Sequence, residues 1–223
     1  MDNIAADPVI QDADRMMMKL KFTPCMLAAC SLSLTGSLFA ASLEVDVKDA
    51  HGNGLPDAAI YVEPLTGTPP ARPRPAEIEQ KNRKFMPLVT VVQTGSEIAF
   101  PNNDTVRHHV YSFSPAKPFE LKLYSGTPGN PVLFDKPGTV VIGCNIHDRM
   151  VAYIQVVNTP YFGKTSDTGK VRITDLPAGR YRLKAWHPQL LLGATMPEPE
   201  ILIAKQDIAM SIALNPATDS KPH

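Results

Sequence analysis

The sequence has no net charge, no helical periodicity and few cysteines. Its 22 basic and 22 acidic side chains balance, so it lacks the basic excess that nucleic-acid partners favour and the acidic block of a disordered tail. No Gly-rich phosphate loop, Ser/His/Asp order or pair of carboxylates in an acidic pocket is present. These absences exclude nucleic acid as the expected partner and leave no sign of an enzyme active site.

Short apolar runs and turn residues fill the chain instead. Proline makes up 22 of 223 residues, about twice the usual ~5%, which favours strands and turns over long helices. Leu43 to Lys48 alternates apolar and polar residues, which predicts a half-buried strand. Thr139 to Gly143 is continuously apolar, which predicts a strand buried on both faces. The fold class predicted is therefore all-β, with a β-sandwich as the default.

Residues 1–41 differ from the rest of the chain. Lys19 and Lys21 precede an uncharged run from Phe22 to Ala41, which is the order of a secretory signal peptide. The acidic stretch before it does not fit, so we expect the natural start at Met16, Met17 or Met18. We expect a cleaved leader and a periplasmic protein. A membrane anchor, if the leader is uncleaved, or a lipid on Cys30 in the lipobox-like Leu27–Cys30 are the alternatives.

Removing the leader changes the cysteine count. Cys25 and Cys30 leave with it, so Cys144 is the single thiol of the remaining chain. One cysteine cannot form an internal disulfide, so Cys144 must be buried, paired between chains, or used. Five of the nine methionines also leave, and four are too few for a Met-rich copper-scavenging surface.

Cys144, His147 and Met150 lie in one short run, and the pair His108-His109 precedes it. A thiolate, two imidazoles and a weak thioether form the ligand set of a blue-copper site. Adjacent strand residues point to opposite faces, so His109 is expected beside the site or facing solvent, with a role as alternative ligand left open. A buried, inert Cys144 or a zinc site remains an alternative.

From about Glu77 to Val157 the chain resembles the cupredoxins. The resemblance is carried by Phe85-x-Pro87, Gly95, Asn102-Asn103-Asp104 with His108 after it, and Cys-x2-His-x2-Met, a spacing similar to the short loop of amicyanin. It implies a Greek-key β-sandwich with one mononuclear type 1 copper bound by His108, Cys144, His147 and Met150. His109 and Asn103 are then the candidates for a supporting or alternative role. His109 stands where the family has Asn, and Asp148-Arg149 replace an apolar rim.

A second resemblance, to carboxypeptidase-regulatory-like (transthyretin-like) sandwiches, flanks the first. Val45 to Ala58 carries one half, and Thr165 to His187 carries the other. We therefore predict residues 1–41 as leader, 42–66 and 160–215 as the two halves of this small sandwich, 67–159 as the cupredoxin domain, and 216–223 as a disordered tail.

The predicted function is a periplasmic one-electron carrier with copper as cofactor and unidentified redox partner proteins. It is not expected to be an enzyme, because four protein ligands leave no open position for substrate. A likeness to methylamine utilisation proteins would rest on the amicyanin resemblance alone. The alternatives are a copper-handling or storage protein, a non-redox β-sandwich interaction module, and an oxidoreductase subunit whose catalytic centre lies on another chain.

Overall fold

The computed structural model describes residues 40–190 and 198–215. Most of the predicted leader, including Cys30, and the predicted tail lie outside the described residues. The first strand begins at Ala41, the last residue assigned to the leader, and Ala41 is buried against the end-strand core described below. In the described part, no helix is long and apolar enough to cross a membrane.

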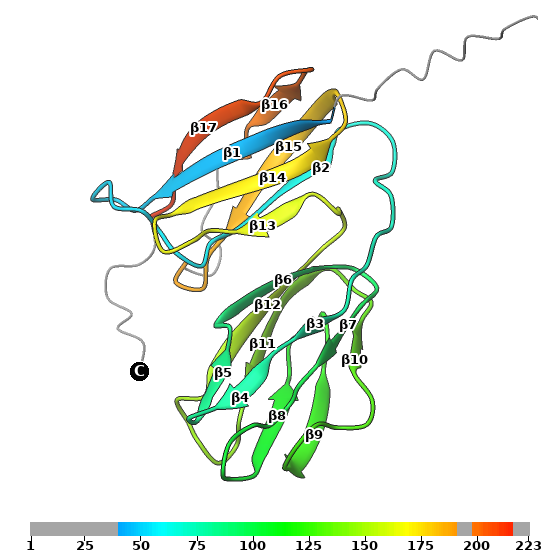
Figure 1. Ribbon diagram of the computed structural model, residues 1–223, viewed down its shortest axis with the longest axis vertical. Coiled ribbons are helices and arrows are strands. Elements are labelled where there is room, and N and C mark those ends of the chain that lie inside the picture. Colours follow the sequence, from blue (N-terminus) through cyan, green and yellow to red (C-terminus); the bar gives the residue numbers. More distant parts are fainter. Residues whose placement is uncertain (1–39, 191–197, 216–223) are drawn as a thin grey trace, which may run out of the picture. The chain divides into compact units, whose positions relative to one another are not determined.

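The described residues contain strands and no helix, which confirms the all-β prediction. The strands, coloured along the chain in Figure 1, are β1 (Ala41–Lys48), β2 (Ala59–Pro64), β3 (Ala76–Glu77), β4 (Glu79–Lys81), β5 (Lys84–Met86), β6 (Val89–Gln93), β7 (Ser96–Ala99), β8 (His108–Ser112), β9 (Phe119–Tyr124), β10 (Val132–Phe134), β11 (Gly138–Gly143), β12 (Val151–Val157), β13 (Phe162–Lys164), β14 (Lys170–Leu176), β15 (Gly179–Trp186), β16 (Glu200–Ile203) and β17 (Ile208–Ala213).

The first two and last five strands form two sheets, which we call the end-strand sandwich, and residues of β1, β2 and β14 to β17 build its hydrophobic core. Its sheets have the orders β14-β1-β17 and β13-β2-β15-β16. The alternation predicted for Leu43 to Lys48 is present, because Leu43, Val45 and Val47 are fully buried and their neighbours are not. Strands far apart in sequence pair here, since β2 lies beside β13 and β1 beside β14. A core of this kind needs both ends of the described chain.

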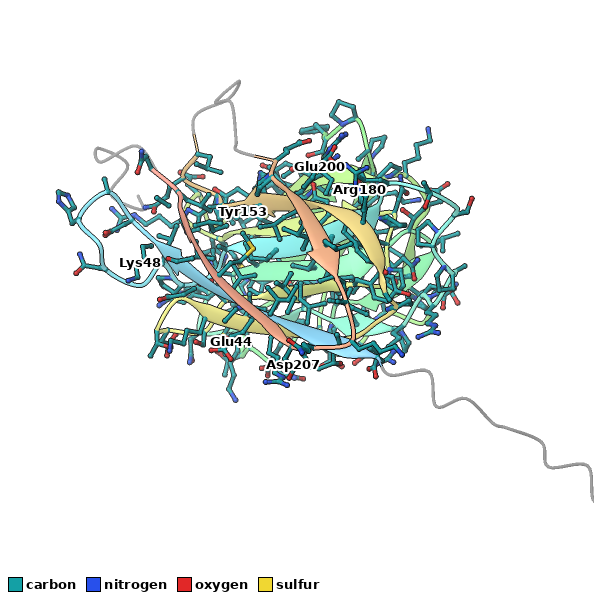
Figure 2. The ribbon with its side chains drawn as sticks, turned by 90° about the horizontal axis from the view of Figure 1, so that it is seen from above. Glu44, Lys48, Tyr153, Arg180, Glu200 and Asp207 are labelled. Carbon is teal, nitrogen blue, oxygen red and sulfur yellow. The ribbon has the colours of Figure 1, made fainter. Side chains whose placement is uncertain are left out.

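Exposed ion pairs lie on the surface of the end-strand sandwich. Arg180 on β15 and Glu200 on β16, labelled in Figure 2, lie 2.5 Å apart from Nη2 to Oε2. Asp207, also labelled, pairs with Arg172 at 2.7 Å. Because these side chains are largely solvated, the two pairs contribute little to stability. The sandwich is therefore held together by its apolar core.

Strands β3 to β12 form a second core, which we call the central sandwich. Its largest sheet has the order β6-β12-β11-β8-β9, a smaller one the order β10-β7-β3, and β4 and β5 form a hairpin (Figure 1). Phe100, Phe134, Ile142 and Ile154 are fully buried in this core. Cys144 and Met150 belong to the same cluster, so both ends of the predicted ligand loop are anchored in this core.

The prediction that Thr139 to Gly143 is buried on both faces is wrong. Strand β11 alternates instead, with Val140 and Ile142 fully buried and Val141 41% exposed. Periodicity alone could not reveal this, because an apolar residue can face solvent without a polar neighbour to mark it. The run still forms a strand, paired with β12 along its whole length.

His187 follows β15 and is buried. It has a structural role and is not part of a metal-binding or other functional site. Its Nε2 lies 3.2 Å from the carbonyl oxygen of Pro56. Burial lowers the pKa of His187 below its ordinary value, against smaller opposing effects of that hydrogen bond and of Asp57. The folded protein therefore resists protonation of this imidazole more than the unfolded chain does.

This burial predicts a pH dependence of stability. Below about pH 6.5, the ordinary histidine pKa, the unfolded chain takes up a proton at residue 187 before the folded protein does. As the pH is lowered through that window, the free energy of unfolding should decrease. The slope from this residue is at most about 1.4 kcal/mol per pH unit. Urea denaturation at several pH values should show a shallower decline in His187→Gln. Equal slopes in both proteins would contradict the assignment.

Candidate metal centre

The loop from Cys144 to Met150 joins β11 to β12 and closes on itself. The amide of Cys144 donates to the carbonyl of Met150 at 3.2 Å, and the amide of Met150 donates to the carbonyl of His147 at 2.9 Å. The antiparallel pairing of β11 and β12 ends at Gly143 and Val151, so the first of these bonds continues the ladder by one step. Cys144 and Met150 are therefore held opposite each other, with His147 in the turn between them.

Three donor atoms converge at this loop. The Sγ of Cys144 lies 3.9 Å from Nδ1 of His108 and 3.9 Å from Nδ1 of His147. All three donors lie within 4.8 Å of one another, and this is the one such group of three found among the described residues. The two imidazole rings have their centroids 5.0 Å apart and meet edge to face. The structure thus gathers residues from β8 and from the loop after β11.

Burial separates the donors from bulk water on one side. Cys144 is a free thiol and is 3% exposed, His108 is fully buried, and His147 is partly exposed at the edge. The single backbone pairing of β11 with β8, at Gly143 and Tyr111, brings the two donor-bearing segments together. A side chain at position 143 would meet the Tyr111 ring at 3.2 Å, so glycine permits this close approach.

His108 is the first residue of β8, and the strand is irregular there. Its pairing with β9 shifts register between His108 and Val110, which is the mark of a β-bulge. His109 is also buried, so of its two expected positions, beside the site or facing solvent, the second is wrong. Its Nε2 lies 2.9 Å from a carboxylate oxygen of Glu120. His109 is outside the donor group.

The residue that contacts Nε2 of the His108 ring is Asp104, which was not among the predicted supporting residues. Its Oδ2 lies 3.0 Å from Nε2 of His108 and accepts from the amide of Arg83 at 2.8 Å. Its pKa is lowered to about 2, first by the hydrogen bond with His108 and then by the amide of Arg83. Asp104 is thus a carboxylate at neutral pH, placed to accept from Nε2–H and to leave Nδ1 of His108 free to ligate.

Asn103, predicted as a supporting residue, points elsewhere. Its side-chain amide donates to Glu79 at 2.9 Å, and its backbone amide donates to the carbonyl of Gln80. Sequence reasoning missed Asp104, although a carboxylate in a turn four residues before a ligand histidine was a usable signal. The contact depends on how the loop folds, which the spacing did not specify.

Met150 is 1% exposed and packs in the same cluster as Cys144. Its role as an axial ligand stays a prediction.

The donor set fits a metal ion. Two donors bound to one metal at about 2.0–2.3 Å lie roughly 3.5–4 Å apart, which matches the sulfur-to-nitrogen distances of 3.9 Å. The same distances are long for hydrogen bonds between these groups. One thiolate and two imidazoles suit copper or zinc, and a nearby thioether favours copper.

Comparisons with known proteins found similar solved structures, but no similar sequence family or curated protein. No family model matches the chain, and no curated protein matches it. The structure is similar to a purple cupredoxin from Nitrosopumilus maritimus, at 19% identity and a TM-score of 0.33 over 36% of this chain and 98% of that one. It is similar to a Cu-containing nitrite reductase from Thermus scotoductus, at 24% identity and a TM-score of 0.35 over 42% of this chain and 25% of that one.

A reduced mutant of amicyanin is also similar, at 15% identity and a TM-score of 0.33 over 36% of this chain and 79% of that one. At these TM-scores no functional conclusion follows from the structural similarity, so the function is inferred from the site.

Proposed function

We propose that the chain is an exported type 1 copper protein that carries single electrons. The observation that carries this proposal is the convergence of His108, Cys144 and His147, whose donor atoms lie within 4.8 Å of one another and whose Nδ1 atoms each lie 3.9 Å from the sulfur. Met150, buried in the same cluster, is proposed as the weak axial ligand. Copper bound there would supply a Cu(I)/Cu(II) couple.

The protein's residues are arranged to suit such a site. Cys144 must lose its proton to ligate, and its burial keeps competing water away from the sulfur. Asp104 holds His108 in the tautomer that presents Nδ1. The loop carrying His147 is fixed by two backbone hydrogen bonds. Because strand β8 and the hydrogen-bonded loop after β11 hold the donors, little rearrangement should accompany a change of oxidation state, which favours fast electron transfer.

The wider assignment is also a proposal. It comprises a cupredoxin domain over residues 67–159, a carboxypeptidase-regulatory-like sandwich formed by 42–66 and 160–215, export to the periplasm, and redox partner proteins there. We propose a carrier and not an enzyme, because four protein ligands would fill the site. A copper store is the competing function, and it shares every ligand, so redox behaviour must separate the two.

The test is the visible spectrum of the purified protein after addition of Cu(II). A type 1 site should give an intense blue or green thiolate-to-copper band, and Cys144→Ser should abolish the band because oxygen replaces the thiolate. Reversible one-electron voltammetry should follow in the loaded protein. The variant is nearly isosteric, so its circular dichroism should match the wild type.

Stable but colourless binding of metal would contradict the proposal and favour a zinc or storage site. A band that persists in Cys144→Ser would show that another residue supplies the sulfur. A band without reversible redox behaviour would support the copper store over the carrier.

A further inference from the structure

We propose that Asp104 is the positioning residue of this centre, and that its carboxylate favours the cupric state and lowers the reduction potential. This inference depends on the proposed function, because it concerns the same copper. It goes further by assigning the control of the potential to one residue outside the ligand set.

The first ground is the contact with His108. The distance from Nε2 to Oδ2 is 3.0 Å, with the His108 side chain fully buried and the Asp104 side chain 10% exposed. In such a setting a hydrogen bond to a carboxylate is stronger than one to a neutral acceptor. It makes the imidazole a stronger donor at Nδ1, the atom that lies 3.9 Å from the Cys144 sulfur.

The second ground is that Asp104 is itself held from several sides by the backbone. The amide of Arg83 donates to Oδ2, and the amide of Thr105 donates to Oδ1, each at 2.8 Å. Arg83 and Asn82 have φ values of +57° and +52°, the pair of positive angles found in a type I′ hairpin turn. The β4–β5 hairpin therefore aims an amide at the carboxylate that contacts the ligand.

The loop is anchored by a second set of hydrogen bonds. The side chain of Asn102 donates to the carbonyls of Val106 and Tyr124 at 3.0 and 2.7 Å, and accepts from the amide of Asp104 at 3.0 Å. Asn102 is itself 3% exposed. The carboxylate thus has little freedom to turn away from His108.

The third ground is charge. Among the described residues, the one ion pair of Asp104 is the contact with His108, so no lysine or arginine side chain neutralises the carboxylate. A fixed negative charge one imidazole away stabilises Cu(II) more than Cu(I), because the attraction grows with the charge of the ion. Removing the charge should therefore raise the reduction potential.

The experiment compares Asp104→Asn and Asp104→Ala with the wild type, all loaded with copper. Asparagine keeps an acceptor for Nε2–H and loses the charge, whereas alanine loses both. Asp104→Asn should lower the ratio of Cu(II) to Cu(I) affinity about tenfold, which is a rise of about 59 mV in the potential. Asp104→Ala should lower Cu(II) affinity by about 10–100-fold. Spectroelectrochemistry and competition with a Cu(II) chelator give these values.

Asp148→Asn is the matched control, because it removes the same charge from an exposed position beside His147. Water and salt screen that charge, so its potential should move by less than half as much. Asp104→Glu, which keeps the charge, should stay closer to the wild type than Asp104→Asn does.

A potential in Asp104→Asn equal to that of the wild type, or moved no further than in Asp148→Asn, would overturn the inference. The reduction potential is measured on the copper-loaded fraction only. A loss of stability alone would leave the potential of that fraction unchanged, which distinguishes a merely structural role. Absence of the thiolate-to-copper band in the wild type would instead overturn the proposed function. The two failures are thus distinguishable.

Discussion

His108→Ala is expected to lower the affinity for Cu(II) by more than about 100-fold, the upper end of what loss of a supporting partner costs a metal site. The change removes Nδ1 from the donor group and leaves the Asp104 carboxylate without its imidazole. Because His108 is fully buried, alanine also leaves a void that exogenous imidazole can enter. Chelator competition measures the loss, and added imidazole should restore part of the thiolate-to-copper band.

His109→Ala is the matched control for this experiment. The two histidines are adjacent and both buried, but His109 lies against Glu120 and outside the donor group. Its replacement should change Cu(II) affinity by less than about 10-fold, the lower end of the effect of a supporting residue. An affinity loss in His109→Ala as large as in His108→Ala would show that His109 is the ligand. The pair thereby decides a question that sequence alone left open.

Gly169→Ala is expected to lower the free energy of unfolding by about 2–5 kcal/mol. Gly169 has φ +78°, and an added Cβ would lie 2.4 Å from the carbonyl oxygen of Val47 and 2.7 Å from Cα of Gly54. The left-handed conformation costs a non-glycine residue about 1–2 kcal/mol, and overpacking adds about 1–3 kcal/mol. The clashing atoms belong to the backbone, so no side chain can move aside. Urea denaturation measures the change.

Gly52→Ala separates these two costs. Gly52 has φ +82° but nothing within 4 Å of an added Cβ, so only the conformational cost of about 1–2 kcal/mol applies. A loss in Gly169→Ala no larger than in Gly52→Ala would contradict the close packing of the β1–β14 end around Gly169. Both variants lie in the end-strand sandwich, so the spectrum of the copper site should stay unchanged in each.

The fold class follows from local patterns. The alternation of Leu43 to Lys48 predicted β1 because a strand sends successive side chains to opposite faces, so neighbouring residues record the burial. The same logic failed for β11, where Val141 is apolar and faces solvent. Apolar residues are common on surfaces, so a continuous apolar run does not specify two buried faces.

The candidate ligands could be named from their chemistry and spacing, since a thiolate, imidazoles and a thioether in one short run are rare by chance. What the sequence could not assign was the support around them. Asn103 is adjacent to Asp104 in the sequence and close to His108, yet its side chain donates to Glu79. The carboxylate of Asp104 takes the place beside His108.

The sequence by itself determined that this protein is built from strands and carries one thiol-containing donor run. Both properties are encoded by residues close together in the chain. The tertiary structure decided which histidine of the His108-His109 pair meets Cys144, and that the amide of Arg83 donates to the Asp104 carboxylate. Those contacts join β4–β5, the loop before β8 and the loop after β11. Contacts between segments so far apart depend on the packing of the whole sandwich, and no local pattern records them.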